Sequence, residues 1–507
     1  MNNRKSRTQY AIKNIGFSTY NKILSLILSF VSRTVFIQYL GSGYLGLNGL
    51  FGDVLNLLSM ADLGFGVAMA YSFYEPLAHD DKRKVAALVT FYKRAYTVIA
   101  LVVTVVGLLL IPFLPYLINL DKPIAHINLY YLFSLANVVA SYVSVYKTTI
   151  LSADQRNYVV VKITMITSII QTVLQIAVII LFKSYLAYLI VGTFFVWFNN
   201  LYASHVASKE YPYINEKVEL KKSDRQDIYK NISSVFIYKV ANVLLTATDN
   251  LLISVLVGTV AVGYYSNYQM IQTRVIEFYT LLFSSITASI GNLIITEGYD
   301  KRYQVFNTAQ SISFITSGII VPCYTILINS FIGIWLGPKY VFNVWTTLAI
   351  GLNTYFSCVM QPLWSYREAT GLYRKTKWIM VICAIENLVL SVVLGKMWGV
   401  AGILFASAFS RATTYIWYEP KILFKEYFNR GTKKYYQDLL INLLFVLALI
   451  VIGIFIIKII APKNFVIWCV AAVIIFALSS SLALFAYRKT EGAQRVLSLV
   501  KRKLVRR

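Results

Sequence analysis

Apolar runs of roughly 20 residues or more recur along the whole sequence and are separated by short polar segments. Each run is long enough to cross a bilayer and lacks the strict alternation of a β-strand. Because membrane-embedded backbone must satisfy its hydrogen bonds internally, such runs favour helices over a barrel. The pattern predicts an all-α polytopic membrane protein with fourteen transmembrane helices. The predicted spans are residues 16–40, 47–73, 87–117, 128–151, 159–182, 185–206, 231–257, 262–295, 306–334, 341–364, 378–394, 400–418, 439–460 and 465–486.

Two stretches of this pattern match each other. Residues 13–46 and 230–263 share landmarks at a constant separation of 217 positions. The matched pairs are Lys13 and Lys230, Lys22 and Lys239, Gly41 and Gly258, and Gly46 and Gly263. An apolar helix with a lysine near its entry and a glycine turn at its exit therefore starts each of two comparable halves. Internal repeats of this kind are typical of transporters in which two bundles rock about a site near the membrane midplane.

The repeat divides the sequence into two six-helix lobes followed by an unpaired helix pair. The predicted segments are an N-terminal lobe (1–207), a cytoplasmic linker (208–230), a C-terminal lobe (231–418), a second cytoplasmic linker (419–438), and helices thirteen and fourteen with a basic tail (439–507).

Composition excludes an array of soluble domains, because 58% of the residues are hydrophobic, only 14% are charged and the mean hydropathy is +0.62. The net charge of +26 reflects an uneven distribution of basic residues. The termini and alternate connections hold 33 of the 48 Lys and Arg residues, and the intervening connections hold six. By the positive-inside rule, both termini are cytoplasmic and the helix count is even. We interpret the charge as a topology signal and a contact for anionic lipid, with no nucleic-acid partner.

Ten ionisable residues lie well inside the predicted spans, where a charged side chain costs about 2.5–3.5 kcal/mol on insertion scales. Each therefore needs a partner, water or a function. The ten are Lys22, Arg33, Asp53, Asp62, Lys239, Asp249, Arg274, Glu277, Glu386 and Arg411.

The first predicted helix carries two cations on nearly the same face. Lys22 and Arg33 are eleven residues apart, so their directions differ by only about 20° at 100° per residue. Both can face one cavity and pass an anionic phosphate along it, because arginine binds phosphate oxygens in a fork and lysine is a mobile point charge. Lys239, the repeat counterpart of Lys22, joins this predicted phosphate-binding set. Alternatively, Lys22 reaches the inner headgroups and Arg33 pairs with Asp53.

Acidic residues of the second and eighth helices are candidate cavity acids. Asp53 and Asp62 are nine residues apart, on opposite sides of a straight helix, so at most one of them faces the cavity. Asp62 is followed by Gly64 and Gly66, which permit a bend or a close contact between helices, so we interpret Asp62 as a packed and hydrogen-bonded acid. Arg274 and Glu277 are three residues apart, so they either neutralise each other or supply a second phosphate-binding arginine beside an acid.

The seventh helix carries Asn242, Thr246 and Asp249 at i, i+4 and i+7. These hard oxygen ligands, on an otherwise apolar helix, suit a sodium ion or a proton relay. Alternatively, Asp249 pairs with Lys239.

The stretch RTVFIQYLGSGYLGLNGLFGDVLNLLSMADLGFG at residues 33–66, the fourteen spans and the six-plus-six-plus-two plan resemble a known family. This family comprises the Wzx-like polysaccharide transporters, or oligosaccharide-lipid flippases, of the multidrug/oligosaccharidyl-lipid/polysaccharide exporter superfamily. The resemblance covers roughly residues 13–487. It implies a flippase of the bacterial cytoplasmic membrane that moves polyprenyl-diphosphate-linked oligosaccharide for capsule, exopolysaccharide or O-antigen synthesis, by alternating access between two lobes. Lipid II flippases, which also have fourteen spans, are a close alternative.

The resemblance also implies site residues. In this superfamily the eighth helix meets the first two at the lobe interface, which makes Arg274 a phosphate candidate. Lipid II flippases hold a cation between helices seven, eleven and twelve. Glu386 and Asn387 of the eleventh helix would therefore join the seventh-helix residues in a Na⁺ or H⁺ site. Alternatively, Glu386 pairs with Arg411.

The expected partners are the lipid-linked oligosaccharide, membrane lipid, and the polysaccharide polymerase and assembly proteins of the pathway, with the transporter itself a monomer. Neither a cofactor nor a bound metal is expected beyond the coupling Na⁺ or H⁺. A membrane enzyme of the same pathway and a lipid scaffold without transport are alternatives from other classes. An enzyme needs positioned catalytic groups, but His79, His126 and His205 are widely spread and show no metal-ligand spacing. We therefore predict no catalytic residues.

Overall fold

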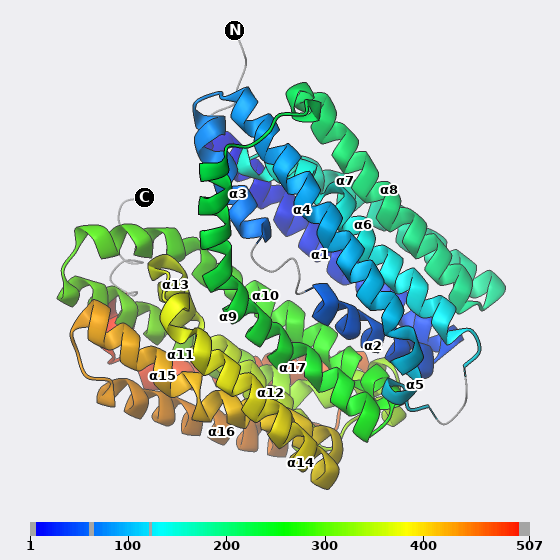
Figure 1. The fold of residues 1–507 in the computed structure, drawn as a ribbon. Helices are drawn as coiled ribbons and strands as arrows, with labels where there is room; N and C mark the ends of the chain where they lie inside the picture. Colours follow the sequence, from blue (N-terminus) through cyan, green and yellow to red (C-terminus); the bar gives the residue numbers. More distant parts are fainter. Residues whose placement is uncertain (1–6, 60–64, 121–123, 496–507) are drawn as a thin grey trace. The chain divides into compact units, whose positions relative to one another are not determined.

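A computed structural model describes residues 7–59, 65–120 and 124–495. Every element within these ranges is helical, in agreement with the predicted fold class (Figure 1). Contacts divide the chain into two compact units, Met1–Gly263 and Tyr264–Arg507, and the boundary falls inside α10 (Thr259–Thr296). The lobes predicted above are defined by sequence repetition and not by contacts, so their boundaries stay a prediction.

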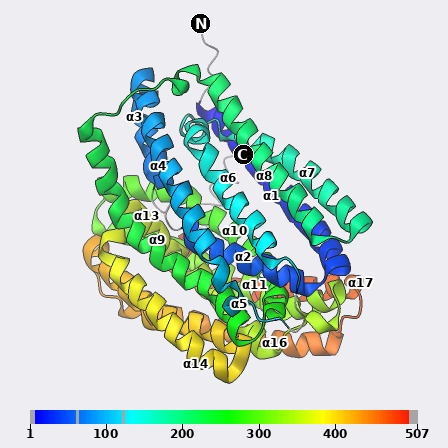
Figure 2. The ribbon, with the colours of Figure 1, turned by 45° about the vertical axis from the view of Figure 1, so that its right-hand side comes forward.

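The first unit is a bundle of long helices. It contains α1 (Arg7–Leu40), α2 (Ser42–Leu58), α3 (Phe65–Ala78), α4 (Lys82–Leu109), η2 (Ile111–Phe113), α5 (Leu114–Leu117), α6 (Ile127–Ala153), α7 (Asn157–Phe182), α8 (Tyr185–Glu210), η3 (Pro212–Asn215), α9 (Lys222–Leu256) and the start of α10. In this bundle α6 packs along α8 and α4, α1 packs along α7, and α2 packs against α9 (Figure 2).

Polar side chains bond across the seams between these helices. Ser144 of α6 donates to the amide oxygen of Asn200 on α8 at 3.1 Å. Thr167 of α7 donates to the amide oxygen of Asn199, also on α8, at 2.8 Å. Because hydrocarbon offers no partners, hydroxyl and amide groups at membrane depth are placed where a neighbouring helix can bond them. Both bonds fix α8 between its two neighbours.

The glycine turns that the repeat predicts occupy equivalent places. Gly41 (φ 86°) precedes α2 and Gly258 (φ 136°) precedes α10, and both have backbone angles that side chains rarely allow. A Cβ on Gly46 would overlap the carbonyl oxygen of Thr259, and one on Gly263 would overlap the backbone at the start of α2. Two of the matched landmarks, 217 residues apart, thus form one close backbone contact within the first unit.

The connection between α8 and α9 is fixed to the helices beside it. Tyr211 donates to a carboxylate oxygen of Asp154 at 2.6 Å, and Lys147 donates to the Asn215 amide oxygen at 3.0 Å. Burial, together with the neighbouring Asp154 carboxylate, raises the pKa of Tyr211, so its hydroxyl stays protonated and remains a donor at neutral pH. The segment that follows α8 is therefore held at the end of the bundle.

The second unit is built around one long helix, α11 (Tyr299–Trp335). It also contains η4 (Pro338–Tyr340), α12 (Val344–Val359), α13 (Gln361–Thr370), α14 (Tyr373–Thr413), α15 (Tyr415–Leu423), the π-helical turn η5 (Phe424–Phe428), α16 (Lys433–Ile460) and α17 (Phe465–Tyr487). α11 packs against α12, α16 and α17, and α12 packs against α14.

α14 turns back on itself where two separate spans, 378–394 and 400–418, were predicted. Gly399 has φ 58° and ψ −135°, outside the helical region. A Cβ on Gly402 would overlap the carbonyl oxygen of Leu394, so the two arms approach without room for a side chain. The glycines are what allow this tight reversal.

Ten helical stretches in the described ranges are long and apolar enough to cross a membrane. One of them, Lys375–Phe428, includes the turn at Gly399, while α2 and α12 have only 17 and 16 residues against the roughly 20 that a bilayer requires. The protein is thus a multi-pass membrane protein, and the count of fourteen spans stays a prediction.

One buried amide joins four helices of the second unit. Asn442 of α16 is fully buried and donates to the Tyr487 hydroxyl of α17 at 2.6 Å and to the Phe314 carbonyl of α11 at 3.3 Å. Its oxygen accepts from the Tyr355 hydroxyl of α12 at 3.0 Å. These bonds hold α16 and α17, the predicted unpaired helices, on α11 and α12.

Asn442→Leu is expected to destabilise the protein by about 1–3 kcal/mol, because buried hydroxyl and carbonyl groups on three helices would lose their partner. A lowered unfolding temperature in detergent would measure this loss. Ile441→Ala is the matched control, since Ile441 is the preceding residue of α16 and is 62% exposed. Equal unfolding temperatures for Asn442→Leu and Ile441→Ala would contradict the assigned role of Asn442.

Candidate functional site

Arg33 lies on α1 beside a group of aromatic rings in the first unit. The guanidinium is close enough to the Tyr188 hydroxyl of α8 to interact with it electrostatically. The ring of Tyr185 lies 4.9 Å from those of Tyr44 and Tyr130, and 6.1 Å from that of Tyr188. We call Tyr44, Tyr130, Tyr185 and Tyr188 the tyrosine cluster. A guanidinium beside one phenol of such a cluster can bind an oxyanion through charge, while the cluster offers hydroxyls and ring faces to a polar organic group.

The two predicted lysines are half-buried. Lys22 lies on α1, which is continuous from Arg7 to Leu40, so the spacing that puts Lys22 and Arg33 on nearly one face applies. Lys239 lies on α9 in the same unit. Their assignment to the phosphate-binding set stays a prediction.

Asp53 of α2 bonds to a neutral partner. The amide of Asn250 on α9 donates to its carboxylate at 2.5 Å, and Asn250 is 2% exposed. The bond joins the second predicted helix to the seventh, which begins the second repeat. Asp62, the other candidate acid of that predicted span, lies outside the described residues.

Arg274 and Glu277 of α10 form the ion pair that their spacing predicts. The guanidinium lies 3.0 Å from the carboxylate, and the side chains are 26% and 38% exposed. Arg274 and Glu277 therefore neutralise each other in the structure, as one of the two alternatives predicts. Phosphate binding by Arg274 stays a prediction.

The predicted cation-site residues belong to two units. Asn242 is exposed and Asp249 half-buried on α9 in the first unit, and the Thr246 side chain is outside the described part of the chain. Glu386 and Asn387 lie on α14 in the second unit. A cation site composed of all five is untested and stays a prediction.

The α14 residues have local hydrogen-bond partners. Glu386 accepts from the Thr413 hydroxyl at 2.6 Å, a bond that joins the two arms of α14. The amide of Asn387 is completely buried and donates to the Ser407 hydroxyl at 2.8 Å. Both side chains therefore help to close the α14 hairpin, whatever further role they have.

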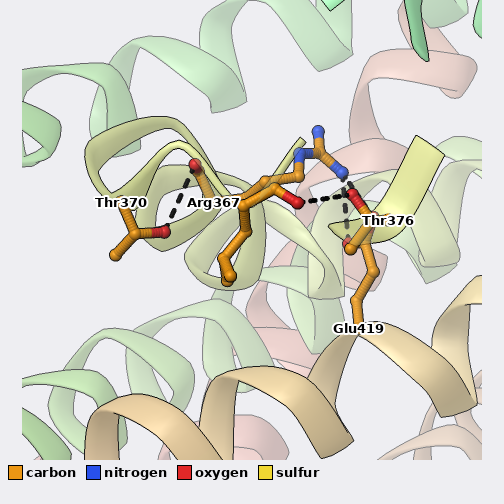
Figure 3. A network of polar contacts seen from close by, with 5 residues as sticks. Arg367, Thr370, Thr376 and Glu419 are labelled. Atoms are coloured by element: carbon orange, nitrogen blue, oxygen red, sulfur yellow. Dashed lines mark hydrogen bonds and ion pairs between the residues drawn. The ribbon is translucent and has the colours of Figure 1, made fainter. Parts of the chain in front are cut away.

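Sequence reasoning missed a buried ion pair between α13 and α15 (Figure 3). One guanidinium nitrogen of Arg367 lies 2.8 Å and 3.1 Å from the two carboxylate oxygens of Glu419. The side chains are only 9% and 5% exposed. The rings of Trp364 and Tyr373 lie 5.7 Å and 5.4 Å from the guanidinium carbon. Burial of this pair at an element junction indicates a structural role.

Arg367 lies in the basic connection between the predicted spans 341–364 and 378–394, and in the structure its side chain is buried within α13. The available signal was weak: Glu419 stands alone next to Pro420 in an aromatic and apolar segment. Such an acid needs a partner, but its position does not identify the partner.

The comparisons with known proteins agree with this architecture. A sequence profile described as "Polysaccharide biosynthesis protein" matches residues 11–290, more than half of the chain. The chain therefore belongs to the polysaccharide biosynthesis protein family. No curated protein matches the sequence.

Solved structures with a similar fold include a lipid II flippase and multidrug transporters. A lipid II flippase MurJ in an inward closed conformation has a TM-score of 0.63 at 14% identity, covering 94% of this chain and 100% of that chain. An inward-facing MATE family multidrug resistance transporter has a TM-score of 0.58 at 13% identity, covering 78% and 94%. A mutant form of the Vibrio cholerae MATE transporter VcmN has a TM-score of 0.53 at 13% identity, covering 83% and 98%.

Arg367→Met is expected to lower stability by about 3–5 kcal/mol, because it leaves the Glu419 carboxylate buried without its charge partner. The double variant Arg367→Met/Glu419→Leu should lose less than Arg367→Met alone, since both charges are gone. Thermal unfolding in detergent measures the effect, and Glu368→Gln, an exposed neighbour, is the control. Additive losses in the double variant would refute the pairing.

Proposed function

We propose that this protein is a flippase that translocates polyprenyl-diphosphate-linked oligosaccharide repeat units across the bacterial cytoplasmic membrane. The observation that carries the proposal is Arg33. It is a cation within the transmembrane helix α1, beside the tyrosine cluster, in a chain of the polysaccharide biosynthesis family. A charge at membrane depth is costly, so an anionic cargo that passes it gives the arginine a function.

In the proposed cycle, the diphosphate binds Arg33 and Arg274, with Lys22 and Lys239 along its path. The sugars lie in a hydrated cavity between two lobes and hydrogen-bond to hydroxyls of the tyrosine cluster. The polyprenyl tail stays in lipid near α16 and α17. Rocking of one lobe against the other then exposes the head group to the outer side. No covalent bond changes in this cycle, so it requires no catalytic residue.

The proposal includes a topology and partners. The fourteen spans follow from the apolar runs, and the cytoplasmic position of both termini follows from the distribution of basic residues. The transporter acts as a monomer, with a polysaccharide polymerase and assembly proteins receiving its cargo for capsule, exopolysaccharide or O-antigen synthesis.

A lipid II-type flippase is the second candidate. It is supported by the fold similarity to MurJ, which extends over the whole of that chain. Both cargoes share a polyprenyl diphosphate, so the arginines would have the same role in either case. Reconstituted transport with each lipid-linked cargo distinguishes the two candidates.

Arg33→Gln is expected to reduce transport by roughly tenfold to a hundredfold, because a charged hydrogen bond to phosphate is worth about 1.5–3 kcal/mol. The measurement is the amount of lipid-linked repeat unit that accumulates on the inner leaflet, with membrane insertion checked separately. Lys339→Gln, an exposed cation outside the proposed path, is the control. Normal export by Arg33→Gln would overturn the proposed site and favour a scaffold or an enzyme.

Arg274 requires a double variant because it is paired with Glu277. If the ion pair is its whole role, Arg274→Gln/Glu277→Gln should transport normally, since the variant removes both charges together. If Arg274 also binds the diphosphate, as we propose, transport should fall at least about tenfold in both the single and the double variant. The same accumulation assay separates these results.

Asp249→Asn tests cation coupling. The substitution keeps the shape of the side chain and removes the charge that would hold Na⁺ or be protonated, so gradient-driven transport should fall roughly tenfold or more. Transport into vesicles with and without an imposed Na⁺ or H⁺ gradient is the measurement. Asp80→Asn, an exposed loop variant, is the control. A gradient response equal to that of the wild type would remove Asp249 from the proposed coupling site.

A further inference from the structure

A groove of about 450 Å³ lies on the first unit between α4, the segment 218–220 and the beginning of α9. Phe91, Val98, Ile99 and Leu220 give it an apolar floor. The connection from α8 forms one wall, and the Thr90 hydroxyl of α4 fixes this wall by donating to a backbone carbonyl of that connection, at 3.2 Å. The groove therefore has defined sides.

The rim of the groove is charged. Arg94 of α4 lies 3.4 Å from the carboxylate of Glu219, and these side chains are 65% and 75% exposed. Arg225 of α9 also lines the groove, and its Nε donates to the Leu220 carbonyl at 3.0 Å. Two guanidinium groups and one carboxylate leave a formal charge of +1. An exposed pair such as Arg94 and Glu219 is weak enough to open for a better anion.

The depth of the groove matches the membrane surface. Arg94 is the last charged residue before residues 95–117, which contain no charge and are long enough to cross the hydrocarbon. Since α4 begins at a basic segment, the positive-inside rule assigns this end to the cytoplasm. Directly beyond Arg94, Val98, Leu101 and Val105 are 61%, 63% and 47% exposed and form an apolar stripe at helical spacing. The charged rim at Arg94 is thus followed directly, along α4, by an exposed apolar surface suited to lipid.

We propose that this groove binds an anionic phospholipid of the cytoplasmic leaflet. The phosphodiester, with one negative charge, lies between Arg94 and Arg225, where arginine forks match phosphate oxygens. One acyl chain covers the apolar floor and continues along Val98 and Leu101. The bound lipid joins α4 to the connection between α8 and α9, so it strengthens the attachment of that connection. The inference does not depend on the identity of the transported cargo.

The test is native mass spectrometry of the full-length protein released from nanodiscs that contain phosphatidylglycerol and phosphatidylcholine in equal amounts. Retained phosphatidylglycerol should exceed phosphatidylcholine for the wild type. Arg94→Gln/Arg225→Gln should retain at least roughly tenfold less phosphatidylglycerol, since it removes both charge-assisted contacts of arginine with the phosphate. Lys93→Gln is the matched control. It removes one charge from the exposed neighbour of Arg94 and should retain phosphatidylglycerol as the wild type does.

A second variant gives a change of opposite sign. Glu219→Gln removes the carboxylate that competes for Arg94 and raises the rim charge, so it should retain roughly fivefold more phosphatidylglycerol. If the Arg94–Glu219 pair were purely structural, Glu219→Gln would retain no additional phosphatidylglycerol and would have a lower unfolding temperature. Unfolding temperatures of all variants in detergent separate lost binding from lost folding.

Three results would overturn the proposal. One is equal retention of phosphatidylglycerol by the wild type and the double-arginine variant. Another is an equal loss in Lys93→Gln, which would make the effect one of general surface charge. The third is release of the lipid by inorganic phosphate at a concentration of roughly 10 mM, low enough to leave general charge screening weak, which would show that the groove recognises phosphate without a lipid chain.

Discussion

The hydrocarbon interior of a bilayer offers no hydrogen-bond partners, and this constraint governs the polar side chains of both units. In the second unit, Asn442 satisfies its amide through groups on three other helices. In the first unit, Asp53 reaches Asn250 on α9. Separating any of these helices would leave a polar group unmatched. The four helices that Asn442 joins are therefore expected to move together as one rigid group.

Much of the fold was predictable because helices reflect a local property of the sequence. Apolar runs predicted the ends of α6, α7, α8 and α17 to within four residues, whereas α1 and α16 begin nine and six residues before their predicted spans. The glycine turns were predictable from the repeat, and both Gly41 and Gly258 have a positive φ in the structure, 86° and 136°. The reversal at Gly399 was predictable as well, since it lies between two predicted spans. Hydropathy and glycine position carry this information without knowledge of distant neighbours.

The partners of the polar residues were less predictable because they depend on helix rotation. Arg274 and Glu277 are three residues apart, and helical geometry alone gave their ion pair as one of two alternatives. Arg367 and Glu419 lie on different helices, and nothing local links them. The candidate site shows the same difference. Arg33 was predictable because it is a cation within an apolar helix. The tyrosine cluster was not, because nothing in the sequence distinguishes its four members from the other tyrosines among the 38 in the chain.

The contact between Gly46 and Gly263 has a consequence for biosynthesis. A ribosome makes the chain from its N-terminus, so α1 and α2 enter the membrane before Gly263, 217 positions after Gly46, has been added to the chain. During that interval the bare backbone at Gly46 lies against lipid or the insertion machinery. α2 can therefore take its final position only after α10 has been inserted. A nascent chain that stops before Gly258 lacks the residues against which Gly46 packs, so its first unit stays incompletely packed.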